Sequence, residues 1–235
     1  MKKIILSIST LFLVSGFAFA QSADEIIDKY VIALGGKDKL TNLRTIVMEG
    51  IVSAQGMEIP VTTTIVHKKG MRIDFSVMGM DAWTIMRPDS GWSFMPFSGQ
   101  TKPEPIPSEM LKQSANQWDL SGQLYEYTSK GNKVEYLGLD DVEGTECHKL
   151  KCVDPNGNVS YYLIDPKTYF LVKTITKINA GGKEMEAETK FSNYKEIEGG
   201  FVYPHTVESM NGPMDLTKIS VNVDVPDAKL LISNQ

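Results

Sequence analysis

The sequence of 235 residues has few of the residue types that catalytic and metal centres use most often. It holds two cysteines and three histidines, and it contains no GxSxG, HExxH or phosphate-binding glycine loop. His67, His148 and His205 each fall in a predicted strand, and no two of them have the spacing of metal ligands. We therefore predict no catalytic residue, no metal site and no cofactor, and a protein that is not an enzyme. A hydrolase is the alternative, and it would need a nucleophile that the sequence does not reveal.

The two cysteines, Cys147 and Cys152, lie five residues apart in one predicted strand. Because side chains alternate along a strand, they point to opposite faces, with Cα atoms about 16 Å apart. A disulfide requires Cα atoms within about 7 Å. Unless the strand is broken, we predict two separate thiols.

Basic residues are outnumbered, with 24 Lys and Arg against 29 Asp and Glu. Without Lys2 and Lys3, which belong to a predicted signal peptide, 22 basic residues face 29 acidic ones, a formal charge of −7. Nucleic-acid binding needs clustered Lys and Arg to displace counterions, so we predict no nucleic-acid partner. Attraction to an anionic membrane surface is disfavoured for the same reason.

A long apolar run occurs only at the N-terminus. Two lysines precede the apolar residues 4–17, and residues 18–20 read Ala-Phe-Ala, a small-x-small cleavage site. This pattern is typical of a secretory signal peptide. A membrane anchor is the alternative, but the run is short for a span of about 20 residues. We predict a signal peptide over residues 1–20 cleaved after Ala20, a periplasmic location, and a single domain over residues 21–235.

One segment has the clear pattern of an amphipathic helix. Residues 22–34 begin with Ser22 and Glu25 in a capping box and continue with an apolar stripe at helical spacing. Residues 37–43 form a short second predicted helix. A further helical segment is predicted at residues 108–117, after a proline-rich loop that we expect to be unable to extend a sheet ladder.

Most other segments are short strands that alternate apolar and polar residues between turns. Residues 159–178 show this best, because Asp165 and Pro166 form a turn between two runs of aromatic and β-branched residues. We predict a mainly β (α+β) fold, a large curled antiparallel sheet or unclosed half-barrel of about eleven strands. A few helices would form a lid over an apolar cavity.

The apolar face of such a sheet is larger than these helices can cover. The first half of the chain is also rich in methionine, whose flexible side chain suits surfaces that adapt to varied apolar ligands, although methionine equally fills gaps in ordinary cores. The alternative is two sheets packed as a sandwich, which needs no cavity, and the pattern alone leaves it open.

Several stretches resemble the LolA/LolB-like lipoprotein-carrier superfamily. They are the signal peptide, the helix ending in ALGG at residues 33–36, VHKKGMRIDFSV at 66–77, YYLIDPKTYFLVKT at 161–174 and FVYPHTVE at 201–208. The resemblance implies an unclosed β-barrel with helices as a lid over a cavity that takes lipid acyl chains. It also implies a basic residue near the third strand that clamps the lid. The matching position is Lys69, and because lysine lacks the fork of arginine, the clamp would be weaker or differently used.

We therefore expect a periplasmic carrier of lipid or lipoprotein acyl chains, with a role in outer-membrane lipoprotein sorting and with inner- and outer-membrane protein partners. Lys69 is the candidate lid clamp. The candidate residues lining the cavity are Met71, Ile73, Phe75, Trp83, Ile85, Trp92 and Phe94. The alternative function is an envelope-stress sensor or protein-assembly module that uses the same fold to contact a protein instead of a lipid.

Overall fold

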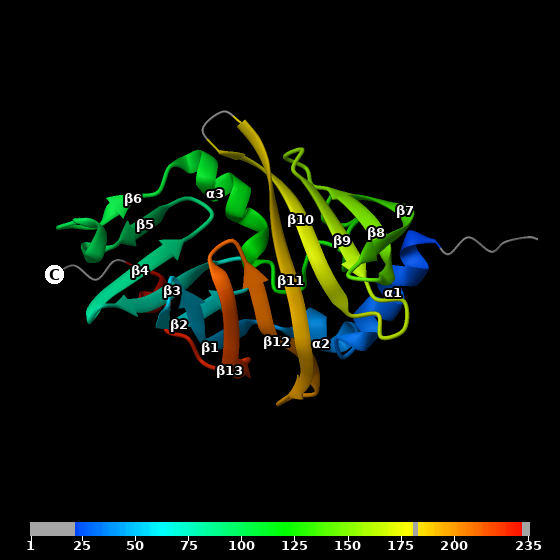
Figure 1. The fold of residues 1–235 in the computed structure, drawn as a ribbon, viewed down its shortest axis with the longest axis horizontal. Coiled ribbons are helices and arrows are strands. Elements are labelled where there is room, and N and C mark those ends of the chain that lie inside the picture. Colours follow the sequence, from blue (N-terminus) through cyan, green and yellow to red (C-terminus); the bar gives the residue numbers. More distant parts are fainter. Residues whose placement is uncertain (1–21, 181–182, 232–235) are drawn as a thin grey trace, which may run out of the picture.

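The computed structural model describes residues 22–180 and 183–231 (Figure 1). The predicted signal peptide and its cleavage site lie outside the described residues.

One antiparallel sheet of thirteen strands runs through the described part of the chain. Its first six strands in chain order are β1 (Thr45–Ala54), β2 (Met57–Val66), β3 (Gly70–Val77), β4 (Met80–Met86), β5 (Gly91–Phe94) and β6 (Glu104–Pro105). The others are β7 (Lys133–Val142), β8 (Thr145–Val153), β9 (Val159–Ile164), β10 (Leu171–Ala180), β11 (Lys183–Ile197), β12 (Phe201–Ser209) and β13 (Gly212–Val221).

The strand order is β6-β5-β4-β3-β2-β1-β13-β12-β11-β10-β9-β8-β7, so the sheet consists of two meanders joined where β1 pairs with β13. The two outer strands, β6 and β7, do not pair with each other, and the sheet is therefore unclosed. This confirms the predicted curled antiparallel sheet, with thirteen strands in place of about eleven. A single sheet also excludes the sandwich alternative.

Few helices accompany the sheet. The α-helices are α1 (Ala23–Ala33), α2 (Lys37–Asn42) and α3 (Ser108–Ser114), and the 3-10 helices are η1 (Pro96–Ser98), η2 (Ala115–Trp118) and η3 (Asp227–Leu230). The Ser22 side chain accepts a hydrogen bond from the Glu25 N–H at the start of α1, as the capping pattern predicts. Gly35 follows α1 with φ +118°, a conformation that glycine adopts readily.

The turn between β9 and β10 confirms the predicted hairpin and changes one boundary. The Asp165 carboxylate accepts hydrogen bonds from the backbone N–H groups of Lys167 and Thr168, at 2.9 and 2.7 Å. Tyr169, predicted to begin the returning strand, instead adopts φ +57°, and β10 begins at Leu171. The proline-rich segment also differs from prediction, because Glu104 and Pro105 form the short edge strand β6. Proline is tolerated there because an edge strand needs fewer N–H donors.

Two separate apolar clusters fill the helix-side face of the sheet. Cluster 1 joins α1 and α2 to β8, β9 and β10, and its buried members are Ile26, Ile27, Val31, Leu40, Leu124, Tyr125, Leu150, Cys152, Ile164 and Leu171. Cluster 2 joins η2 to β1, β2, β3 and β13, and its buried members are Ile46, Ile65, Met71, Trp118, Leu216 and Ile219. The two clusters divide the covering helices, with α1 over one half of the sheet and η2 over the other.

Cys147 and Cys152 are both buried and free, which confirms the prediction of two separate thiols. Cys152 belongs to cluster 1, whereas Cys147 lines a depression on the other side of the sheet with Lys190 and Glu208. Both lie in the unbroken strand β8, so the alternation of side chains separates them.

Replacing Leu150 by Ala tests the contribution of cluster 1 to stability. Leu150 is fully buried, so Leu150→Ala should lower the free energy of unfolding by about 3 kcal/mol through lost transfer energy and the cavity left behind. The matched control is Leu139→Ala on strand β7, where the side chain is 52% exposed and the expected change is within about 0.5 kcal/mol. Urea unfolding of both variants measures the difference, and equal losses would contradict the assignment of this core.

Candidate functional site

The seven residues predicted to line one cavity fall on two faces of the sheet. In the register of β3 and β4, Met71 pairs with Met86, Ile73 with Thr84 and Phe75 with Ala82. None of these partners is Trp83 or Ile85, the two residues of β4 that were predicted to line the same cavity. Paired residues of an antiparallel sheet point to the same face. The helix-side face carries Met71, Ile73 and Phe75, whereas the opposite face, here called the outer face, carries Trp83, Ile85, Trp92 and Phe94.

The helix-side face offers apolar surface beyond the buried members of cluster 2. Ile73 and Val207 are half-buried, and both pack against that cluster. Phe75 is also half-buried and meets Phe97 of η1 edge-on, with ring centroids 6.0 Å apart. The other half-buried apolar residues packed against cluster 2 include Met48, Met86, Leu120, Tyr203, Met214 and Val221. This apolar strip is the candidate binding surface for a hydrocarbon chain.

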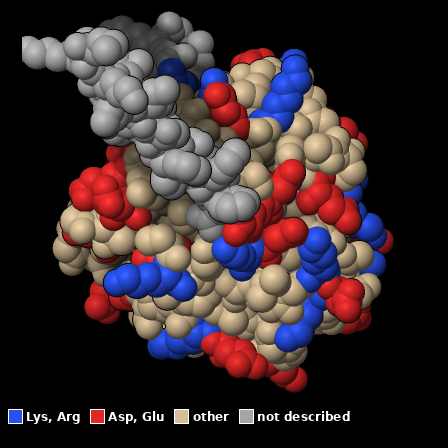
Figure 2. Space-filling model, turned by 90° about the vertical axis from the view of Figure 1, so that its right-hand side faces the viewer, with Lys and Arg blue, Asp and Glu red and all other residues tan. Residues whose placement is uncertain are grey.

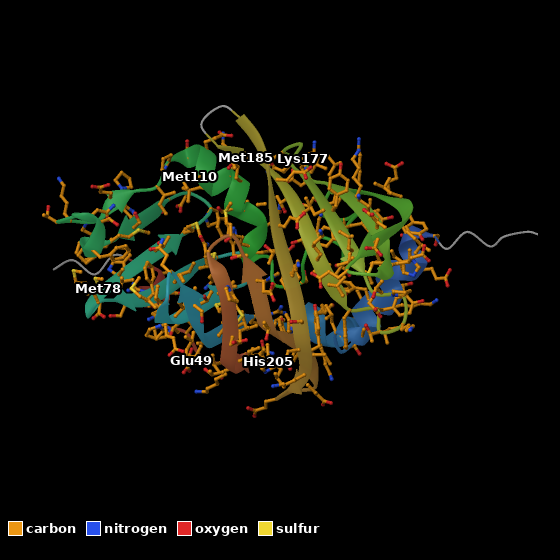
Figure 3. All side chains as sticks on the ribbon, in the orientation of Figure 1. Glu49, Met78, Met110, Lys177, Met185 and His205 are labelled. Carbon is orange, nitrogen blue, oxygen red and sulfur yellow. The ribbon has the colours of Figure 1, made fainter. Side chains whose placement is uncertain are left out.

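Helix α3 and the following η2 cover this strip with few apolar contacts. Trp118 at the end of η2 is 5% exposed and packs in cluster 2 beside Met71. In α3, only Leu111 is buried, and Met110 is 57% exposed at the upper edge of the molecule in Figure 3. Helix α1 differs, because it buries Ile26, Ile27 and Val31 in cluster 1. The structure thus has one firmly packed helix and one lightly attached covering segment, α3–η2, which we call the lid.

Polar contacts tie the lid to the turn between β2 and β3. The backbone N–H of Lys68 donates to the carbonyl oxygen of Trp118 at 2.9 Å. The N–H of Leu120 donates to His67 Nδ1 at 3.1 Å. Asp119 lies between these bonds, 3.7 Å from His67 Nδ1, and forms an ion pair with Lys130 at 2.7 Å. These contacts hold Trp118 against the sheet without a large apolar interface.

Charge and burial set the protonation states of His67 and Asp119, at the point where the lid meets the turn between β2 and β3. Burial lowers the pKa of His67 below its ordinary value of 6.5, against the attraction of Asp119 and with the repulsion of Lys68, Lys130 and Arg44. Burial by itself raises the pKa of Asp119. The hydrogen bond and charge of Lys130 outweigh that effect, so the Asp119 pKa lies below its ordinary value. A neutral His67 and an ionised Asp119 are the states that keep the lid contacts intact.

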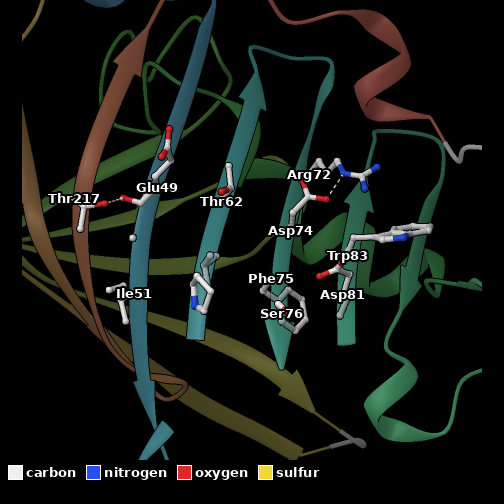
Figure 4. A pocket seen from close by; sticks show the side chains of 14 residues that line it. Glu49, Ile51, Thr62, Arg72, Asp74, Phe75, Ser76, Asp81, Trp83 and Thr217 are labelled. Atoms are coloured by element: carbon white, nitrogen blue, oxygen red, sulfur yellow. Dashed lines mark hydrogen bonds and ion pairs between the residues drawn. The ribbon is translucent and has the colours of Figure 1, made fainter. Parts of the chain in front are cut away.

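The outer face carries a groove of about 570 Å³ across β13, β1, β2, β3 and β4 (Figure 4). A row of paired residues crosses it, in the order Glu49, Thr62, Asp74 and Trp83. Figure 4 shows the groove extending from Glu49 and Thr217 at one side to Trp83 and Asp81 at the other. Its floor therefore mixes carboxylates, hydroxyl groups and an indole ring.

Comparison with family models gives no match, and comparison with curated proteins gives none. Among solved structures, the chain is similar to a DUF1329 family protein from Desulfovibrio piger, at 13% identity and TM-score 0.56 over 90% of this chain and 98% of that one. It is similar to a LolA superfamily protein from Nitrosomonas europaea, at 12% identity and TM-score 0.56 over 90% and 98%. It is also similar to a putative outer membrane lipoprotein-sorting protein domain from Vibrio parahaemolyticus, at 13% identity and TM-score 0.53 over 89% and 95%.

The chain has a LolA-like fold. At these identities the likeness shows the fold alone, and it confirms the resemblance inferred from the sequence.

In this LolA-like fold, Lys69 lies apart from the lid contacts described above. Its Nζ atom is 3.3 Å from Asp227 Oδ1 of η3, and both side chains are largely exposed. The contacts to the lid come instead from the two preceding residues, His67 and Lys68. These contacts were not predicted from the sequence. The prediction was a lysine side chain as the clamp, whereas the observed contacts use a backbone N–H and a ring nitrogen. In the turn formed by His67, Lys68, Lys69 and Gly70, Lys68 adopts φ +58°.

The described residues contain no group of three or more His, Cys, Asp and Glu side chains that could hold a metal ion. None of the described helices is long and apolar enough to cross a membrane. On the end of the molecule shown in Figure 2, acidic and basic side chains alternate among uncharged ones. The described residues visible on that face therefore present no extended region of one charge.

The buried imidazole of His67 predicts a pH dependence of stability. In the folded state the pKa of His67 lies below its ordinary value of 6.5. As the pH falls, His67 is therefore protonated at a higher pH in the unfolded chain than in the folded one. The free energy of unfolding should then fall as the pH drops below about 6.5. His67→Asn keeps a side-chain acceptor for the Leu120 N–H but cannot titrate. The variant should therefore lose less stability than the wild type between pH 7 and pH 5, as measured by urea unfolding. Part of the dependence should persist, because burial also lowers the pKa of His148. Identical pH dependence in both proteins would contradict a titrating His67.

Proposed function

We propose that the protein is a carrier of lipid or lipoprotein acyl chains that acts in the periplasm after export. The observation that carries the proposal is the position of Trp118, a large apolar side chain held against the apolar strip by a lightly attached lid. The LolA-like fold supports it by analogy, since one similar structure is described as a putative outer membrane lipoprotein-sorting domain. The predicted signal peptide is consistent with this location.

Binding would exchange one apolar contact for another. When the lid moves away, Trp118 leaves cluster 2 and exposes Ile46, Ile65 and Met71. An acyl chain that takes its place covers the same surface and gains about 0.8 kcal/mol for each methylene group removed from water. Opening then requires loss of the contacts at His67, Lys68 and Asp119, of the hydrogen bond from Asn116 of η2 to Asp154 at 3.1 Å, and of the packing of the buried Leu111. Such a balance favours reversible loading and release over permanent capture.

The lid in this proposal is α3–η2 rather than both predicted lid helices. Helix α1 contributes Ile26, Ile27 and Val31 to the buried core, so moving it would expose far more apolar surface. We propose Met71, Ile73 and Phe75 as the predicted lining residues that meet the chain, because they share the face that the lid covers. Roles in lipoprotein sorting, and partners in the inner and outer membranes, belong to the same proposal.

Native mass spectrometry of the protein purified from its own cell envelope tests this function. A carrier should retain a population whose added mass corresponds to a lipid or an acylated peptide, and organic extraction should remove that mass. A protein that is purely ligand-free, and that also fails to bind a fluorescent fatty acid, would rule the carrier function out.

A protein-binding module is the second candidate function, and strand β7 favours it. This strand of ten residues forms an edge of the sheet, with Leu137 and Leu139 exposed. An exposed edge can pair with an extended segment of another protein. This function predicts a stable protein partner in the same native mass spectra and no lipid.

Replacing Ile73 by Asp should abolish binding of a fluorescent fatty acid. A carboxylate on the apolar strip must either be desolvated or draw water into the site, and both outcomes oppose a hydrocarbon chain. The expected loss of affinity is at least about tenfold, measured by fluorescence titration. Ile73→Ala is a second variant, with a smaller loss expected, in case the acidic residue prevents folding. The matched control is Tyr161→Asp, which places the same charge on the outer face of β9 and should leave binding unchanged. Equal effects of Ile73→Asp and Tyr161→Asp would place the ligand elsewhere.

A further inference from the structure

The groove on the outer face lies on the side of the sheet opposite the lid and cluster 2. The side chains of its row of paired residues point away from the lid, because side chains alternate between the two faces of a strand. Phe75 of the helix-side face borders both surfaces, since it also lines the groove. The volume of the groove, about 570 Å³, falls in the range of small-molecule sites. Its polar floor is therefore distinct from the apolar strip, although Phe75 borders both.

The charged floor of the groove is fixed in place. Arg72 is only 15% exposed, and its Nε atom donates to Asp74 Oδ1 at 2.7 Å. Lys229 of η3 completes the arrangement, with its Nζ atom 3.0 Å from Asp74 Oδ2. A partly buried ion pair contributes little net stability, because desolvation offsets the attraction. Its effect here is to hold side chains in one geometry on a rigid sheet, which lowers the ordering cost of binding.

The indole of Trp83 is held by the same charges. The Arg72 guanidinium carbon lies 5.2 Å from the Trp83 ring centroid, and the Phe94 ring lies 6.2 Å from it on the neighbouring strand. Trp83 is half-buried, so it keeps a surface for a ligand while its rotamer is restrained. A restrained, flat apolar ring at the side of a polar groove binds the C–H face of a flat, partly polar molecule.

Polar groups that can meet a ligand surround this ring. Asp81 is exposed, and within the described part of the chain no ion pair or hydrogen bond involves its carboxylate. Thr62 contributes a hydroxyl group to the lining, and so does Thr217, which donates to the Glu49 carbonyl oxygen at 3.1 Å. The groove therefore offers acceptors and hydroxyl groups in several directions.

The charges of the groove nearly cancel. Glu49 is paired with Lys218 at 3.3 Å, and Asp74 is paired with both Arg72 and Lys229. Among the three carboxylates that line the groove, only Asp81 has no cation partner within the described part of the chain. A strongly ionic ligand would meet no compensating field. An uncharged molecule rich in hydroxyl groups can donate to the carboxylates and to the Thr217 oxygen, and it can accept from the Thr62 hydroxyl.

We propose that this groove binds a neutral saccharide. A pyranose ring would place its C–H face against the Trp83 indole and donate hydroxyl hydrogens to the Asp81 carboxylate. Thr62 and Thr217 would meet hydroxyl groups further along the chain of sugars, toward Glu49. Because the groove is open to water on one side, binding would be weak and fast, which suits a surface that holds the protein near glycans.

Isothermal titration of the full chain with maltotriose and, separately, with chitotriose tests the proposal. At least one of these neutral trisaccharides should bind, and Trp83→Ala should lower its affinity roughly tenfold, the effect of one lost aromatic contact. Asp81→Asn should lower the affinity by a smaller factor, because the amide still accepts but without charge. The matched control is Tyr161→Ala, since Tyr161 also lies on the outer face beneath a cation, Lys149 at 5.1 Å, but outside the groove. That variant should bind the sugar as the wild type does.

Three results would overturn the proposal. They are the absence of binding by both trisaccharides, wild-type affinity in Trp83→Ala, and loss of sugar binding in Ile73→Ala, the conservative variant that alters only the helix-side face. Fatty-acid binding is measured separately on the same variants. Failure of the carrier function therefore leaves the sugar result interpretable, and the reverse also holds.

Discussion

The pairing of β1 with β13 is the constraint on which the rest of the structure depends. These strands come from opposite ends of the described chain, and their ladder joins the β1–β6 meander to the β7–β13 meander. Within each meander, neighbouring strands are connected by short turns, so little chain entropy is lost on pairing. The central ladder closes a loop that spans most of the chain. Cluster 2, the lid that packs on it and the outer groove take their positions from this one long-range contact, since cluster 2 and the groove each include residues from β1 and β13.

The two halves of the sheet use their helices differently. Around cluster 1, α1 and α2 complete an ordinary core. Lys29 and Glu25 form an ion pair at its surface, and the hydroxyl group of the buried Tyr125 is satisfied by a hydrogen bond with Thr41 of α2. Around cluster 2, the covering segment contributes Trp118 and Ala115. It buries Leu111 in α3, and it is otherwise held by single hydrogen bonds to the turn between β2 and β3 and to Asp154. Segments with few buried apolar contacts open at lower free-energy cost than the core. The fold thus combines a stable half with a half suited to opening, and the proposed carrier function uses that difference.

The sequence was sufficient for the architecture and insufficient for the site. Turn chemistry at Asp165 and the alternation of Met71, Ile73 and Phe75 predicted hairpins and a half-solvated sheet correctly. The sequence alone could not show whether Trp83 and Phe75 line the same cavity. The face to which a residue points, relative to residues of the neighbouring strand, depends on the length of the turn between the two strands. The two-residue turn at Met78 and Gly79 pairs Val77 with Met80, which places Trp83 and Phe75 on opposite sides. The role of His67 depends on a segment more than fifty positions away in the chain, and no local pattern encodes such a contact.

The two borders of the sheet are unequal. Strand β6 has two residues and contains Pro105, with Pro103 and Pro107 close by, so this border offers almost no backbone groups for another strand. Strand β7, at the opposite border, has ten residues. If two copies of the chain joined border to border, only the β7 sides could meet, and the joined pair would expose two β6 borders that cannot recruit a third copy. Growth into a fibre by this route would stop at two molecules, which protects a protein rich in strands from indefinite polymerisation.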